Sequence, residues 1–98
     1  MKYYRWNNEK NLKLKVQRGV SFEDVLLALE NNRLLGDEKH PNSKAYAKQR
    51  ILIVEIDSYA YLVPYVENKN EIFFKTVITS RKATMIYLGK EKNDDKAG

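Results

Sequence analysis

The chain has 98 residues, with 18 Lys or Arg, 13 Asp or Glu, one His and no Cys. Hydrophobic residues make up 43% and charged residues 32%, which fits one small folded domain and is too apolar for a disordered chain. No apolar stretch approaches the roughly 18 residues of a membrane span, and no secretory signal is evident, so we expect a cytoplasmic protein without membrane contact. The lack of Cys and the single His40 exclude a disulfide framework and a Cys or multi-His metal site, and we expect no metal and no cofactor.

The formal net charge of +5 conceals a segregation along the chain. Residues 1–20 carry six bases and one acid, residues 21–38 one base and five acids, and residues 39–50 four bases and no acid. Basic segments that converge on one face would attract a polyanion such as a nucleic acid. With so small a net charge, an ordinary solvated surface explains the pattern more simply.

Residues 3–6 predict a short first strand, and Asn7 or Asn8 can cap a helix that follows, because an amide side chain accepts an orphan backbone N–H. Residues 12–16 fit two structures. Apolar side chains alternate with lysines, as in a half-buried strand, but the first and last of them also have the i, i+4 spacing of one helix face. We favour a helix that ends at Gly19.

Ser21 begins a better specified helix. Its hydroxyl can accept the N–H of Asp24 while that carboxylate reaches back, which is a capping box. Val20 and Val25 occupy the two positions of a hydrophobic staple. The apolar side chains then repeat with helical spacing at Phe22, Val25, Leu26 and Leu29. The helix is expected to end at the asparagine pair 31–32.

Residues 33–48 contain glycine and proline, lack a sustained period and predict a long surface loop, a kind of segment that is often functional. Three strands follow at residues 50–56, 59–66 and 71–79, and the short turns between them predict an antiparallel meander. Pro64 lies in the middle strand and removes a donor from the ladder, so we expect a bulge at this position.

Ser80 can cap a short terminal helix over residues 81–88, which Gly89 ends. Residues 90–98 are expected to form a mobile charged tail, so that residues 1–89 make up a single domain. The predicted fold class is therefore α+β, with a short N-terminal strand, two helices, a three-stranded antiparallel meander and a short C-terminal helix.

The two faces of the meander differ in composition, because side chains alternate along a strand. In the middle strand one face carries Ala60, Leu62, Pro64 and Val66, and the other carries Tyr59, Tyr61, Tyr65 and Glu67. We expect the helices to cover the apolar face, and the tyrosines to line an exposed face with Lys75 of the last strand close to them.

Four runs of sequence support a comparison with a known family. Residues 61–66 read Tyr-Leu-Val-Pro-Tyr-Val and residues 75–84 read Lys-Thr-Val-Ile-Thr-Ser-Arg-Lys-Ala-Thr. Near the start, residues 6–11 read Trp-Asn-Asn-Glu-Lys-Asn and residues 18–25 read Arg-Gly-Val-Ser-Phe-Glu-Asp-Val. In their order and spacing these runs resemble the BrnT-type toxins of bacterial toxin-antitoxin modules, over most of the chain.

The resemblance implies a RelE-like ribonuclease fold and supports a helix at residues 8–17. It implies a toxin that cleaves RNA without metal, inhibits translation and growth, and is neutralised by a ribbon-helix-helix antitoxin, through which alone it would contact operator DNA. The chain departs from the family at Asn7, where an acid is usual, at Arg18, where His is frequent, and at Gln49, where Glu often precedes the arginine. The last two departures favour a non-catalytic member of the same fold as the alternative.

Metal-free RNA cleavage needs a base for the ribose 2′-hydroxyl, cations to stabilise charge on the phosphate, and an acid for the leaving oxygen. The cationic candidates for catalysis are Arg50, Lys75 and Arg81, of which the two arginines match the family by local motif. An ion pair with Glu55 or Glu71 would explain each arginine equally well, and a surface lysine with an apolar stem would explain Lys75.

The candidates for RNA binding are Tyr61, Tyr65, Lys82, Lys48 and His40. Tyrosines can stack bases, and His40 is the one side chain of a type that titrates near neutrality. Packing is the simpler explanation for the tyrosines, and plain solvation for a lone histidine in a loop. Besides the ribonuclease, two alternatives stay open: a non-catalytic protein that binds an antitoxin or a nucleic acid, and a small domain with another protein partner.

Overall fold

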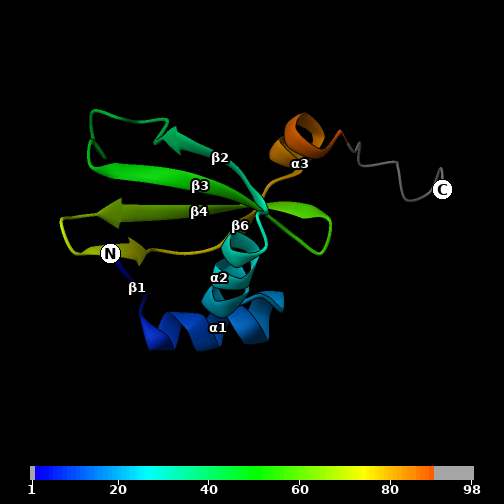
Figure 1. Cartoon of the computed structure of the whole chain (residues 1–98), viewed down its shortest axis with the longest axis horizontal. Coiled ribbons are helices and arrows are strands. Elements are labelled where there is room, and N and C mark those ends of the chain that lie inside the picture. The colour runs from blue at the N-terminus through cyan, green and yellow to red at the C-terminus, as the bar shows by residue number, and fades with distance from the viewer. Residues whose placement is uncertain (1, 90–98) are drawn as a thin grey trace.

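The elements follow one another as a strand, two helices, five strands and a helix in the computed structural model, which describes residues 2–89 (Figure 1). The strands are β1 (Tyr3–Arg5), β2 (Leu34–Lys39), β3 (Gln49–Ile56), β4 (Tyr59–Glu67), β5 (Glu71–Phe74) and β6 (Ile78–Thr79). The helices are α1 (Asn8–Arg18), α2 (Phe22–Glu30) and α3 (Arg81–Leu88). The α+β class is confirmed, and the sheet is mixed and larger than the predicted meander. The predicted tail, residues 90–98, lies outside the described residues.

Capping groups fix the helix ends where the sequence predicts them. The Asn7 side chain accepts a backbone N–H of the first turn of α1 at 2.9 Å. Gly19 ends this helix in the left-handed conformation, with φ of 66°. Ser21 and Asp24 form the capping box of α2 in both directions. Residues 12–16 are therefore helical, and their alternative as a strand is excluded.

β4 is the central strand of a sheet with the order β1-β5-β4-β3-β2, in which β6 also pairs with β4. β3 pairs antiparallel with β4 over its whole length. The turn between them holds Asp57 and Ser58 at φ of 53° and 65°, the left-handed conformation that a two-residue hairpin turn requires. β1 joins the sheet through β5 and runs parallel to it.

Pro64 lies in β4, which continues through it, and the interruption falls in the neighbouring strand. β4 keeps its register with β3 through Pro64, so the predicted bulge in this strand is wrong. The predicted last strand is divided instead into β5 and β6 by residues 75–77, and the Pro64 carbonyl accepts the N–H of Lys75 at 2.7 Å. The N–H and C=O of a strand residue face the same neighbouring strand. The N–H that proline lacks is therefore missing on the edge of β4 that faces residues 71–79.

Residues 34–39, predicted as part of a long loop, form the edge strand β2. They pair antiparallel with β3, and the register shifts between Leu34 and Gly36. This irregularity breaks the alternation by which a strand is recognised in a sequence. Gly36 also allows α3 to approach, since a Cβ there would lie 2.8 Å from the Tyr87 hydroxyl oxygen. The loop that remains covers residues 40–48.

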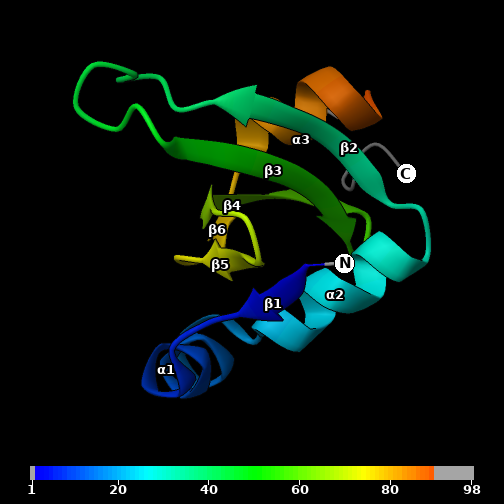
Figure 2. The same ribbon diagram turned by 60° about the vertical axis from the view of Figure 1, so that its left-hand side comes forward.

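Helices cover both faces of the sheet, α1 and α2 on one and α3 on the other (Figures 1 and 2). The main core lies under α1 and α2, where the rings of Trp6, Phe22 and Phe74 stack with centroids 5.5 to 6.2 Å apart. A smaller cluster under α3 centres on Ile53 and Ala60. Within residues 2–89, no helix is long and apolar enough to cross a membrane.

The structure divides the side chains of β4 between two faces as predicted, but the expectation that the tyrosine face is exposed is wrong, because helices cover both faces. Val63 and Tyr65 belong to the main core under α1 and α2, with Tyr61 packed against it. Ala60 and Leu62 face α3 instead. The tyrosines were expected on an exposed face because of their hydroxyl groups. A buried tyrosine ring nevertheless contributes a large apolar area, and its hydroxyl is tolerated in a core where it has a hydrogen-bond acceptor.

The buried hydroxyl of Thr84 is expected to stabilise the attachment of α3. Thr84 is 3% exposed, and its Oγ1 accepts the N–H of Ala60 at 2.9 Å and donates to the Ser80 carbonyl at 2.8 Å. Thr84→Val keeps the shape but leaves the Ala60 N–H buried without an acceptor, and should lower the free energy of unfolding by about 1–3 kcal/mol. Urea denaturation measures this. Thr84→Ser, which keeps the hydroxyl, is the control, and equal stability of the two variants would contradict the prediction.

Candidate functional site

Side chains from three adjacent strands meet around Asp37, which lies in β2. Arg50 of β3 stands directly opposite Tyr65 of β4, so the two share a face of the sheet. Asp37 stands opposite Leu52, which is two residues from Arg50 and therefore on the same face. We call Asp37, Arg50 and Tyr65 the Asp37 cluster. Sequence reasoning missed Asp37 because β2 was assigned to a loop.

Hydrogen bonds connect the members of the Asp37 cluster. The Arg50 Nε donates to Asp37 Oδ1 at 3.1 Å, and the Arg50 Nη2 donates to the Asp37 backbone carbonyl at 3.1 Å. The Tyr65 hydroxyl lies 2.9 Å from both carboxylate oxygens of Asp37 and donates its proton to them. The acid that pairs with Arg50 is thus neither Glu55, which pairs with Arg33, nor Glu71, which pairs with Arg5.

The environment of the cluster fixes the protonation of two of its members. Burial, together with the hydrogen bond to Asp37, raises the pKa of Tyr65 to about 12. The hydrogen bond to Asp37 also raises the pKa of Arg50. Near neutral pH, Tyr65 is therefore a hydrogen-bond donor and a poor acid for catalysis. It is also only 3% exposed, so the prediction that it stacks RNA bases is wrong.

The other two catalytic candidates do not join the Asp37 cluster. Lys75 is exposed, with its ammonium 5.9 Å from the centroid of the Phe73 ring. Phe73 alternates with the core residue Phe74 and therefore lies on the face opposite Arg50, and the Lys75 ammonium lies over its ring. Arg81, followed by Lys82, begins α3 on that same face and is exposed. The expectation that Arg50, Lys75 and Arg81 share one sheet face is therefore wrong.

The remaining candidates lie in or beside the loop 40–48 and β4. His40 Nδ1 accepts the backbone N–H of Asn42 at 3.0 Å, and its ring lies 4.4 Å from that of Tyr46, so His40 organises the loop. Lys48 is exposed near the start of β3. Tyr61 is half-buried against the main core, which restricts it as a platform for bases.

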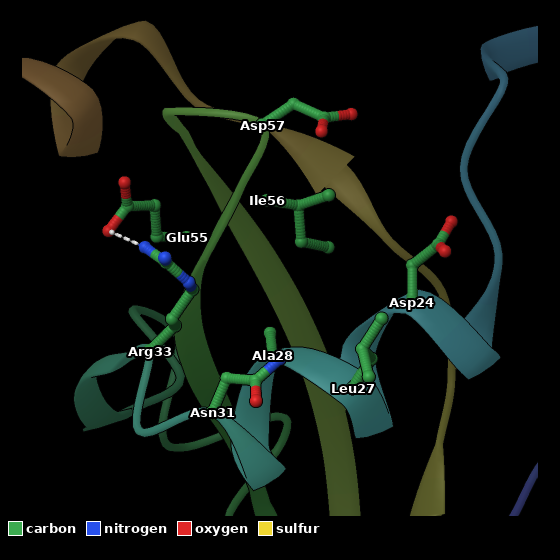
Figure 3. Close-up of a pocket in the computed structure, with 8 residues that line it drawn as sticks. All are labelled: Asp24, Leu27, Ala28, Asn31, Arg33, Glu55, Ile56 and Asp57. Atoms are coloured by element: carbon green, nitrogen blue, oxygen red, sulfur yellow. Dashed lines mark ion pairs between the residues drawn. The ribbon is translucent and has the colours of Figure 1, made fainter.

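Two of the hollows that residues 2–89 form lie beside a helix, and neither of these two is lined by a catalytic candidate. The first, of about 200 Å³, lies between α2 and the turn after β3 (Figure 3). It holds the ion pair of Arg33 and Glu55 on one side and Asp24 and Asp57 on the other, so its acids disfavour a polyanion. The second, of about 240 Å³, lies between α3 and the sheet, with Lys82 among its lining residues.

No metal site is evident in the part of the chain that the structure describes. Among residues 2–89, no three His, Asp or Glu side chains gather closely enough to hold an ion. Among the described residues, the predicted site residues are most strongly organised in the Asp37 cluster.

The stability of the protein above pH 10 is expected to depend on Tyr65. An unfolded tyrosine loses its proton at its ordinary pKa of 10, whereas folded Tyr65 keeps it to about 12, so rising pH favours the unfolded state between these values. The wild type should lose up to about 2 kcal/mol more than Tyr65→Phe across this window. Urea denaturation at pH 9, 10 and 11 measures the difference, and parallel profiles would show that Tyr65 titrates normally.

Comparison of the chain with protein-family models, with curated proteins and with solved structures finds no match.

Proposed function

We propose that the protein is an RNA-cleaving toxin of the BrnT kind, with a RelE-like fold, which acts without metal and is neutralised by a ribbon-helix-helix antitoxin. The resemblance of the four sequence runs supports this proposal. So does the order of the elements, a strand and two helices followed by a largely antiparallel sheet and a terminal helix, which agrees with the order that the resemblance implies. RNA is the substrate, and operator DNA is contacted only through the antitoxin.

The observation that carries the proposal is the basic segment next to the Asp37 cluster. Residues 39–50 contain four bases and no acid. Lys39, Lys44 and Lys48 are exposed, and none of them forms an ion pair with a described residue. These three lysines provide an uncompensated positive surface along the loop and the strand ends, beside Arg50, whose own charge is paired with Asp37. Such a surface suits a phosphate backbone.

Within this proposal Arg50 stabilises the charge that develops on the scissile phosphate. An arginine can hold a phosphate with two parallel hydrogen bonds, and charge stabilisation of this kind is a large contribution to phosphoryl chemistry. Lys75, Arg81 and Lys82 lie on the opposite face, so they contact flanking RNA or act at a second surface.

A non-catalytic member of the fold, which binds an antitoxin or a nucleic acid, is the second candidate. Two observations favour it. The three predicted catalytic cations do not converge, and the hydroxyl nearest to Arg50, that of Tyr65, is held as a donor to Asp37 and is a poor acid near neutrality. Such a protein would keep the basic surface and bind RNA without cleaving it.

Inducible expression in a bacterial host, with mapping of new RNA 5′ ends, tests the proposed function. The wild type should arrest growth and produce discrete new ends. Arg50→Ala should reduce cleavage by about a hundredfold, because it removes the phosphate-stabilising cation. Growth rate and the yield of new ends are recorded for each variant at matched levels of folded protein.

Two further variants complete this experiment. Arg5→Ala removes an exposed arginine that pairs with Glu71 away from the cluster, and serves as the matched control that should remain active. The double variant Lys75→Ala/Arg81→Ala shows whether the opposite face contributes. Unimpeded growth with intact RNA, in cells that contain folded wild-type protein, would contradict cleavage and favour the binding protein.

A further inference from the structure

The guanidinium of Arg50 forms two hydrogen bonds to Asp37 along one edge, and the Arg50 side chain also interacts with that of Tyr65. The guanidinium carries five N–H groups on three nitrogens. The N–H of Nε donates to the Asp37 carboxylate, and one N–H of Nη2 donates to the Asp37 backbone carbonyl. These two donors form the side edge of the planar group. The end edge, made of Nη1 and the second N–H of Nη2, is the edge that can grip a phosphate with two parallel hydrogen bonds.

Asp37 is itself held by a rigid neighbour. The Tyr65 ring is buried in the main core, and its hydroxyl donates to the Asp37 carboxylate at 2.9 Å. The three residues come from three strands that pair side by side, so the sheet sets their spacing. Arg50, which is partly exposed, thus loses the freedom that an arginine side chain usually has at a surface.

We propose that Asp37 is a positioning residue, which Tyr65 locks in place and which holds Arg50 with its end edge turned outward to receive a phosphodiester of RNA. This inference rests on the proposed function for its ligand, and it assigns to Asp37 and Tyr65 a role that acts through Arg50. Asp37 lowers the net charge of the site, so its benefit is the orientation of the arginine and not attraction.

Two explanations of the role of Asp37, compensation of charge and orientation of Arg50, predict opposite changes in RNA affinity when the carboxylate is removed. If the carboxylate only offsets the charge of Arg50, Asp37→Asn makes the site more positive and tightens RNA binding. If it positions the arginine, Asp37→Asn weakens binding, and so does Tyr65→Phe, which leaves every charge unchanged. The expected loss is about fivefold for each variant, the effect of one lost hydrogen bond of ordinary strength.

The test is a double-mutant cycle on the affinity for a 2′-O-methyl RNA oligonucleotide, which binds without being cleaved. Tyr65→Phe and Asp37→Asn are measured alone and in the Arg50→Ala background. Positioning predicts that both lose their effect once Arg50 is absent, because they act through it. Tyr87→Phe, which removes the hydrogen bond from Tyr87 to Glu38 near α3, is the matched control and should bind as the wild type does.

Two results of the cycle would overturn the inference: tighter binding by Asp37→Asn, or an equal loss of affinity with and without Arg50. If the wild type does not bind the oligonucleotide, the proposed function is contradicted. Titration with inorganic phosphate, followed by NMR, then tests separately whether Asp37 and Tyr65 position Arg50. A shift of the Arg50 Nη–H NMR signals, which belong to the edge that would receive the phosphate, supports positioning if it is seen in the wild type and lost in Tyr65→Phe. No shift in the wild type, or the same shift in both proteins, refutes it.

Discussion

β4 is the strand on which the rest of the structure depends, because both of its edges and both of its faces are used. One edge pairs with the whole of β3, and the other is shared between β5 and β6. One face carries Val63 and Tyr65 into the main core, and the other carries Ala60 into the cluster under α3. Pro64 sets where the shared edge divides, since it offers a carbonyl but no donor to the strand beside it. The break allows the chain to leave the sheet edge at residues 75–77 and return as β6, from which α3 starts.

The local signals in the sequence were sufficient for the helices and for the antiparallel hairpin of β3 and β4, and insufficient for the rest of the sheet. Capping depends on a few neighbouring residues, so Ser21 with Asp24, and Gly19, located helix ends correctly. Strand pairing depends on residues far apart in the chain. β2 was missed because the register shift at Gly36 removes its alternation, and the parallel contact of β1 with β5 leaves no signal between neighbouring residues. The burial of the tyrosine face of β4 was missed for the same reason, because the acceptor that makes Tyr65 acceptable in a core is Asp37, on a strand that the sequence did not reveal.

In the candidate site, too, the sequence indicated which residues carry charge but did not indicate which of them lie together in the fold. Counting charges along the chain located the basic segment 39–50, and Arg50 was selected for its chemistry. Whether separate cations meet depends on the face to which each side chain belongs. Lys75 and Arg50 both lie near Pro64 of β4, yet the Lys75 ammonium lies over Phe73, on the opposite side of the sheet from Arg50. A change of one residue in register is enough to separate two candidates that a sequence would place together.

The Asp37 cluster and the loop beside it divide two tasks that a phosphate-binding surface must perform. The ion pair of Arg50 with Asp37 is close to neutral, so it contributes little to long-range attraction. The lysines of the loop carry the net charge, and exposed lysines attract a polyanion without imposing an orientation on it. Arg50 differs from these lysines in both respects. Asp37 compensates its charge, and buried Tyr65 fixes its orientation through Asp37. The exposed lysines would then set the rate at which RNA associates, and the held arginine would set the geometry of the bound phosphate.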